Sequence, residues 1–90
     1  MSLADLQKGV ADFFGLKPEA AVKRGRQNET SFARELFCYL AVTKLRYSGV
    51  EVGQMLGIAG SSVSRSVRRG EDLFLTRDDL QVWWSRLLKQ

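Results

Sequence analysis

The sequence predicts an all-α fold, a compact single domain over residues 1–90 with about five to six helices that include a helix-turn-helix. Apolar residues recur at three- and four-residue steps in successive segments, as on the buried face of a helix. A glycine-containing corner separates two short helical segments, which is typical of a helix-turn-helix. The chain has 90 residues, of which 44% are hydrophobic, enough for one modest core.

The first helix is expected from the N-terminus to about Phe14. Ser2 and Asp5 form a possible capping pair at its start, and Gly15 is placed to close it. Pro18 suits the first position of one or two short turns that reach about Val22. The inward face of the first helix comprises Leu3, Leu6, Val10, Phe13 and Phe14.

A basic loop over residues 23–28 follows, without a large apolar residue. It contains Lys23, Arg24 and Arg26. One interpretation is a solvated connection. The other is an arm that contacts the DNA backbone or minor groove, because basic arms dock in this way beside recognition helices.

A central helix is expected from Thr30 or Ser31 to about Tyr47, as the longest of the fold. Cys38 lies in its apolar run and is expected to be a buried, inert thiol. Arg34, near its start, either reaches a phosphate or is simply solvated. Its main apolar face is predicted to comprise Phe32, Leu36, Tyr39, Leu40 and Thr43, and this apolar surface is broadened by Phe37, Val42 and Leu45.

The first helix of the helix-turn-helix is predicted to begin after Ser48. Ser48 and Glu51 have the spacing of a capping box, and Gly57 is placed to end the helix in a left-handed conformation. Gly53 leaves room for a crossing backbone to approach. Ile58, an apolar residue within the corner, is expected to fill the angle between the two helices.

The second helix is predicted over about residues 61–74, with Ser61 as its cap. Val63 and Val67 face inward, and small hydroxyls and arginines face outward. Such a face suits a DNA major groove, since short serines let the helix sit deep and arginine matches guanine or phosphate. The alternative is a solvated basic face. The outward residues are Ser61, Ser62, Ser64, Arg65, Arg68 and Arg69.

The last helix is expected to begin near Thr76, with Asp79 completing a capping pair. Before it, Gly70 occupies an inward position that indicates either close packing or a kink or early stop of the preceding helix. Trp83 and Trp84 are interpreted mainly as core, although a partly exposed indole would favour an alternative function as a protein-interaction module, or a homodimer. The inward positions are Leu80, Trp83, Trp84, Leu87 and Leu88.

The charges indicate a polyanionic partner. Lysines and arginines number 14 against 10 acids, a net charge of +4. Between Leu36 and Gly70 the only acid is Glu51. The chain has no histidine and no phosphate-binding glycine loop, so we expect no enzyme, metal, cofactor or small-molecule substrate. No apolar run reaches the roughly 18 residues of a membrane span and no signal peptide is visible, so we expect a cytoplasmic location.

The chain resembles the C-terminal DNA-binding domains of bacterial DnaA replication initiators, which are related to the Trp-repressor fold. The likeness extends from Leu6 to Leu88. The resemblance implies double-stranded DNA as partner, sequence-specific binding, and Arg24 or Arg26 in the minor groove. The best matching positions are Ser48, Glu51, Val52, Gly53, Leu56, Gly57, Val63, Arg68 and Arg69.

The corner of the helix-turn-helix departs from that family. The family has Gly-Gly-Arg-Asp-His-Thr-Thr, whereas residues 57–62 read Gly-Ile-Ala-Gly-Ser-Ser. The base-reading Arg-Asp-His is absent, so the scaffold transfers while the target sequence does not. The resemblance favours a module of a mobile-element (transposase-like) protein or a replication-initiator-like protein.

Overall fold

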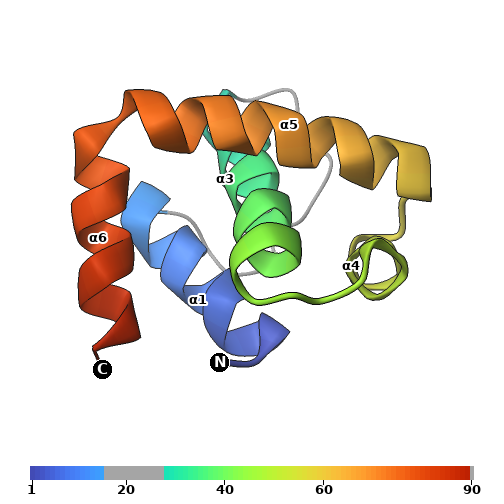
Figure 1. The fold of residues 1–90 in the computed structure, drawn as a ribbon, viewed down its shortest axis with the longest axis horizontal. Helices are drawn as coiled ribbons and strands as arrows, with labels where there is room; N and C mark the ends of the chain where they lie inside the picture. The colour runs from blue at the N-terminus through green and yellow to red at the C-terminus, as the bar shows by residue number, and fades with distance from the viewer. Residues whose placement is uncertain (16–27, 90) are drawn as a thin grey trace.

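The computed structural model describes residues 1–15 and 28–89, and it confirms the all-α fold (Figure 1). Within these residues the chain forms five α-helices and one short π-helix. The predicted turns at Pro18–Val22 and most of the basic loop lie outside the described residues. The helices are α1 (Leu3–Phe14), α3 (Asn28–Tyr39), η1 (Leu40–Lys44), α4 (Gly49–Leu56), α5 (Gly60–Thr76) and α6 (Asp78–Leu88).

Helix α1 confirms the predicted boundaries at both ends. The Ser2 hydroxyl accepts a hydrogen bond from the Asp5 amide at 3.1 Å, which satisfies one of the free amides of the first turn. Gly15 closes the helix with φ of 67°, a left-handed conformation in which a side chain would be strained. Leu6 and Val10 are fully buried, and the helix packs against α3.

Helix α3 and its π-helical extension form the central strut. The α-helix ends at Tyr39 and continues as η1 to Lys44, short of the predicted end at Tyr47. Together α3 and η1 span 17 residues, the same length as α5, so the prediction that the central helix is the longest was wrong.

The predicted apolar face of this strut was only partly correct. Leu36, Tyr39 and Leu40 are buried as predicted, and so are Phe37 and Cys38. Phe32, at 38%, and Thr43 are exposed, contrary to the prediction. The strut packs against α1, α4 and α5, so its middle is buried on several sides. This burial on several sides agrees with the broadened apolar surface and the central position predicted for this helix.

Helix α5 crosses α3 at Gly70, where the two backbones come into close contact. A Cβ atom at Gly70 would collide with the Glu35 carbonyl oxygen and would lie 2.7 Å from Tyr39 Cβ. Gly70 lies inside the uninterrupted helix, so close packing rather than an early stop explains this glycine. Beyond the crossing, Phe74 is buried and its ring lies 5.5 Å from that of Tyr39.

Helix α6 begins at Asp78, and the predicted Thr76 cap was wrong. The Thr76 hydroxyl donates to the Asp72 carbonyl oxygen at 2.8 Å, inside α5. Arg77 occupies the capping position in an extended conformation and has no side-chain capping bond. Its guanidinium pairs with the Asp79 carboxylate at 2.6 Å and, by that hydrogen bond, lowers the pKa of Asp79.

The two tryptophans belong mainly to the core. Trp84 is 7% exposed, and Trp83 is half-buried with its ring 5.4 Å from that of Phe13. Leu87 and Trp83 also pack over Gly9 of α1. The interaction-module alternative therefore receives no support from this pair.

Candidate nucleic-acid interface

Helix α4 is held at both ends by the residues that the sequence indicated. The Ser48 hydroxyl accepts from the Glu51 amide and the Glu51 carboxylate accepts from the Ser48 amide, both at 3.1 Å. This reciprocal pair is a complete capping box. Gly57 ends the helix with φ of 70° and donates its amide to the Gly53 carbonyl oxygen.

The corner between α4 and α5 is built around Gly53 and Ile58, the two residues that the sequence indicated. The Ile58 amide donates to the Gly53 carbonyl oxygen at 3.0 Å. A Cβ atom at Gly53 would lie 2.9 Å from the Ile58 carbonyl oxygen and 3.4 Å from Val63 Cγ2 of α5, so this glycine makes room for the backbone of the corner and for a side chain of the second helix. Ile58 is half-buried against the core, as expected of a residue that fills the angle.

Ser61 does not cap α5, contrary to the prediction. The helix begins at Gly60, with Ala59 as its N-cap and no side-chain capping bond. The Ala59 carbonyl oxygen accepts from the amides of Ser62 and Val63 at 3.0 and 3.1 Å. Because α5 begins at Gly60, Ser61 lies in the first turn of the helix, where its side chain is exposed.

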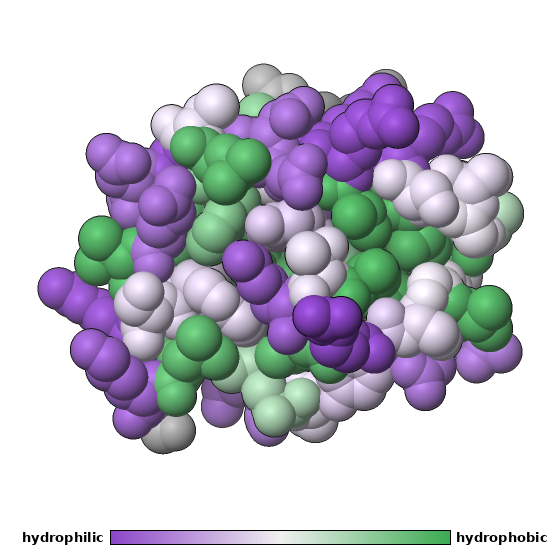
Figure 2. Space-filling model, viewed as in Figure 1, coloured by the Kyte–Doolittle hydropathy of each residue, from purple (hydrophilic) through white to green (hydrophobic). Residues whose placement is uncertain are grey.

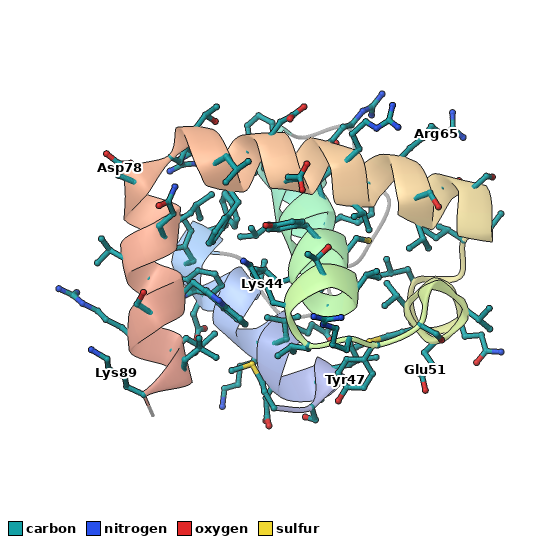
Figure 3. The ribbon with its side chains drawn as sticks, in the orientation of Figure 1. Lys44, Tyr47, Glu51, Arg65, Asp78 and Lys89 are labelled. Carbon is teal, nitrogen blue, oxygen red and sulfur yellow. The ribbon has the colours of Figure 1, made fainter. Side chains whose placement is uncertain are left out.

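The outward face of α5 is the predicted one. Val63 and Ser66 are buried, Val67 is half-buried, and the hydroxyls and guanidiniums face solvent. Figure 3 shows Arg65 projecting from α5 away from the other helices, and Figure 2 shows hydrophilic surface along the α5 edge of the molecule. Both described termini lie on the opposite side (Figure 1). We call this surface the α5 outward face: Ser61, Ser64, Arg65, Arg68 and Arg69 are exposed, and Ser62 is half-buried at its edge.

Two hollows border this face. The first, of about 320 Å³, lies between α3, the corner and α5. At this hollow Arg34 of α3 lies beside Arg65 and Arg69 of α5, although Arg34 and Arg65 are 31 positions apart in the sequence. The second, of about 340 Å³, is lined by Ser64, Arg65, Arg68 and Arg69. The first is lined by Arg34, Ile58, Ser62, Arg65, Ser66 and Arg69.

The predicted contact residues are therefore distributed unevenly. Lys23, Arg24 and Arg26 lie outside the described residues. Ser48 is exposed at the start of α4, where its hydroxyl accepts the capping bond, and it lines neither hollow. Arg34 is half-buried and joins the α5 residues at the first hollow.

Sequence reasoning missed Glu35, whose carboxylate lies 3.7 Å from the Arg69 guanidinium. The stretch in which Glu51 was counted as the only acid begins at Leu36, one residue after Glu35. A carboxylate among apolar residues of a predicted core helix was the available signal, since buried acids need a charged or hydrogen-bonding partner. Its partner on α5 became evident only from the crossing of the two helices.

Below this face, Cys38 is buried as expected. Burial raises the pKa of its thiol to about 11, an effect that a hydrogen bond with the Ser66 side chain opposes. The thiol is therefore neutral at physiological pH. Among the described residues, no group of three or more histidine, cysteine, aspartate or glutamate side chains is arranged to hold a metal ion, and no helix is long and apolar enough to span a bilayer.

Comparison with known proteins agrees with this geometry. Residues 3–69 match the family model described as the bacterial dnaA protein helix-turn-helix. The chromosomal replication initiator proteins DnaA of two strains of Thermus thermophilus are each 42% identical to the chain over 53 residues. That alignment covers 59% of this chain and 12% of each initiator, so the chain spans a small part of their length.

These relatives are replication initiators, and they give no support to a mobile-element parent. The family match covers α1, the central strut, the helix-turn-helix corner and the outward face of α5, which are the parts that build the candidate interface. The chain belongs to the bacterial DnaA helix-turn-helix family.

Proposed function

We propose that this domain binds double-stranded DNA sequence-specifically, with the first half of α5 in the major groove. The observation that carries the proposal is the α5 outward face, on which arginines and small hydroxyls are exposed while apolar residues anchor the helix from behind. A helix of this kind fits the width of the major groove. The membership of the chain in the bacterial DnaA helix-turn-helix family supports the same function.

The contacts divide into base reading and positioning. Arg65 projects away from the body of the domain in Figure 3, and a guanidinium in the groove pairs with guanine O6 and N7 through two hydrogen bonds. Arg34 and Arg69 border the first hollow from two different helices, an arrangement suited to a backbone phosphate at the groove edge. We assign Arg68 to the phosphates as well.

Serine side chains allow the helix to approach the bases closely. Ser61 and Ser64 are exposed and Ser62 lies at the edge of the first hollow. Their hydroxyls can donate to or accept from either base edges or phosphates. Gly60 presents no side chain to read a base, so we expect a target different from that of the initiators.

The basic loop supplies a second contact in this proposal. Lys23, Arg24 and Arg26 follow one another closely in sequence before α3, and Arg34, in the middle of α3, borders the first hollow. We assign them to the backbone or to the adjacent minor groove. The parent we propose is a replication-initiator-like protein, in which this domain supplies DNA binding and no catalysis.

The test is a binding titration by fluorescence anisotropy against a duplex selected from a random pool by the domain itself. Four to six phosphate contacts predict a slope of log affinity against log salt of roughly −4 to −5. The selected duplex should bind at least about a hundredfold more tightly than an unselected one. Equal binding to every duplex would contradict sequence-specific recognition, and a flat salt dependence would contradict DNA binding itself.

Arg24→Ala and Arg26→Ala test the loop separately. Each should weaken binding to all duplexes and reduce the salt slope by about one, because one phosphate contact is lost. Unchanged affinity and slope would assign the loop to a solvated connection.

A further inference from the structure

Glu35 is an acidic side chain placed directly behind a cationic surface. It belongs to α3 at the point where Gly70 of α5 packs against the Glu35 backbone, and its side chain is only 11% exposed. Within the described residues, three arginines line the hollow beside it. A carboxylate here opposes the attraction of any polyanion to that surface, so electrostatic affinity alone gives no reason for it.

The geometry of its ion pair indicates a different role. Glu35 Oε2 lies 3.7 Å from a terminal guanidinium nitrogen of Arg69, which is itself 69% exposed. That distance is beyond a hydrogen bond, so the carboxylate attracts the guanidinium without occupying its donors. Arg69 thus keeps its N–H groups available to a ligand on the solvent side.

The neighbouring charges favour an orientation of Arg69 away from the hollow, and the attraction to Glu35 opposes this tendency. Arg34 and Arg65 line the same hollow as Arg69, and three cations around one hollow repel one another. A long, exposed arginine without a counter-charge would occupy many rotamers and turn away from the other two. The fixed carboxylate, held by the α3–α5 crossing, draws Arg69 back to the edge of the hollow.

We infer that Glu35 is a positioning residue: it holds Arg69 at the edge of the first hollow in the orientation that meets a backbone phosphate of the correctly seated duplex. The inference rests on the proposed function. Its consequence is an effect on discrimination between duplexes. The negative charge weakens binding to every duplex, while the ordered guanidinium strengthens binding only where the duplex presents its phosphate at that place.

The experiment compares Glu35→Gln with Glu71→Gln, a matched control that removes the same charge from an exposed position of α5. Both variants should bind an unselected duplex slightly more tightly, by about twofold, because each raises the net charge by one. Only Glu35→Gln should lower the ratio of selected to unselected affinity, by about threefold to fivefold, the scale of one surface ion pair. The ratio for Glu71→Gln should stay within about 1.5-fold of the parent protein.

Arg69→Ala separates positioning from a purely structural role. If Glu35 acts through Arg69, Glu35→Gln should no longer change the ratio in the Arg69→Ala background. A persistent loss in that background would assign Glu35 to the fold alone and overturn the inference. Glu35→Asp provides a second variant should Glu35→Gln unfold, since it keeps the charge and shortens its reach; an undiminished ratio in Glu35→Asp would also contradict the inference.

A measurement on the free protein distinguishes this inference from the proposed function. The Nε–H group of Arg69 should be more ordered by NMR relaxation than that of Arg68, and Glu35→Gln should abolish the difference. Equal mobility of the two arginines in the parent protein would overturn the inference even where sequence-specific binding is confirmed. Failure of the parent protein to bind any duplex would overturn the proposed function, and with it the positioning role on DNA.

Discussion

The two halves of α5 differ in both charge and packing. Residues 60–69 carry Arg65, Arg68 and Arg69 on an exposed face, and only a narrow side of this half is buried. Residues 70–76 carry Glu71 and Asp72 on the exposed side and pack against α3 through Gly70 and Phe74. Figure 1 shows α4 below one end of the helix and α6 descending from the other.

This difference indicates how one helix serves two purposes. The second half fixes the helix on the central strut. Gly70 allows the backbones of α3 and α5 to come into contact, and the buried Phe74 packs against Tyr39 of α3. The first half can then present polar side chains to a ligand without needing them for stability. The acids at the junction limit a polyanion to the first half, since carboxylates repel phosphates. Mutations in the two halves should therefore have separable consequences.

The largest effect is expected for Phe74→Ala in the packed half. Removing a buried phenylalanine typically costs about 3–5 kcal/mol, because transfer free energy is lost and a cavity remains. Phe74 is 7% exposed and its ring contacts that of Tyr39. Chemical denaturation measures the free energy of unfolding. The neighbouring Leu75, which is 62% exposed, is the control: Leu75→Ala should change stability by no more than about 0.5 kcal/mol.

Gly70→Ala should have the next largest effect. The added methyl group meets the Glu35 carbonyl oxygen and Tyr39 Cβ, so α3 and α5 must separate, at a net cost of about 1–3 kcal/mol. Gly60→Ala is the matched control, since nothing lies within 4 Å of a Cβ atom there. Thermal unfolding of both variants measures the difference. A Gly70→Ala variant as stable as Gly60→Ala would contradict the close crossing.

Features that depend on nearby residues of one helix could be predicted from the sequence. The inward position of Gly70 followed from helical periodicity, and the Ser48–Glu51 capping box and the Gly57 end of α4 followed from local spacing. Such features involve residues within one or two turns of each other. The serine and arginine face of α5 was predictable for the same reason.

Features that depend on how helices meet were not predictable. The Ser61 and Thr76 caps were wrong because a shift of one or two residues in the start of a helix changes which side chain lies at the free amides of its first turn. The Glu35–Arg69 pair joins residues 34 positions apart, and it requires the α3–α5 crossing angle. Periodicity along one helix contains no information about that angle.

Arg65→Ala tests the exposed half and should affect binding without affecting stability. Loss of a guanidinium that reads a base should reduce discrimination between selected and altered duplexes by about 1–3 kcal/mol. The free energy of unfolding should remain within about 0.5 kcal/mol of the parent protein, because Arg65 is exposed. Arg86→Ala, an exposed arginine of α6, controls for the loss of one positive charge.

The pattern of loss assigns the role of Arg65. A loss confined to one base position indicates base reading. An equal weakening on all duplexes, together with a salt slope reduced by about one, would assign Arg65 to a phosphate instead.

The smallest effect is expected at the junction of the two halves. Glu71→Gln removes one carboxylate from the residue that follows Gly70, so it lowers the repulsion that any bound duplex experiences. We expect all duplexes to gain affinity by about twofold at low salt, with discrimination unchanged, because an exposed charge acts at a distance and contacts no base. The gain should disappear as the salt concentration rises and the Debye length shrinks below the distance to the nearest phosphate. A gain that persists in high salt, or that favours one sequence, would mean that Glu71 touches the duplex directly, and the bound region would then extend beyond the first half of α5.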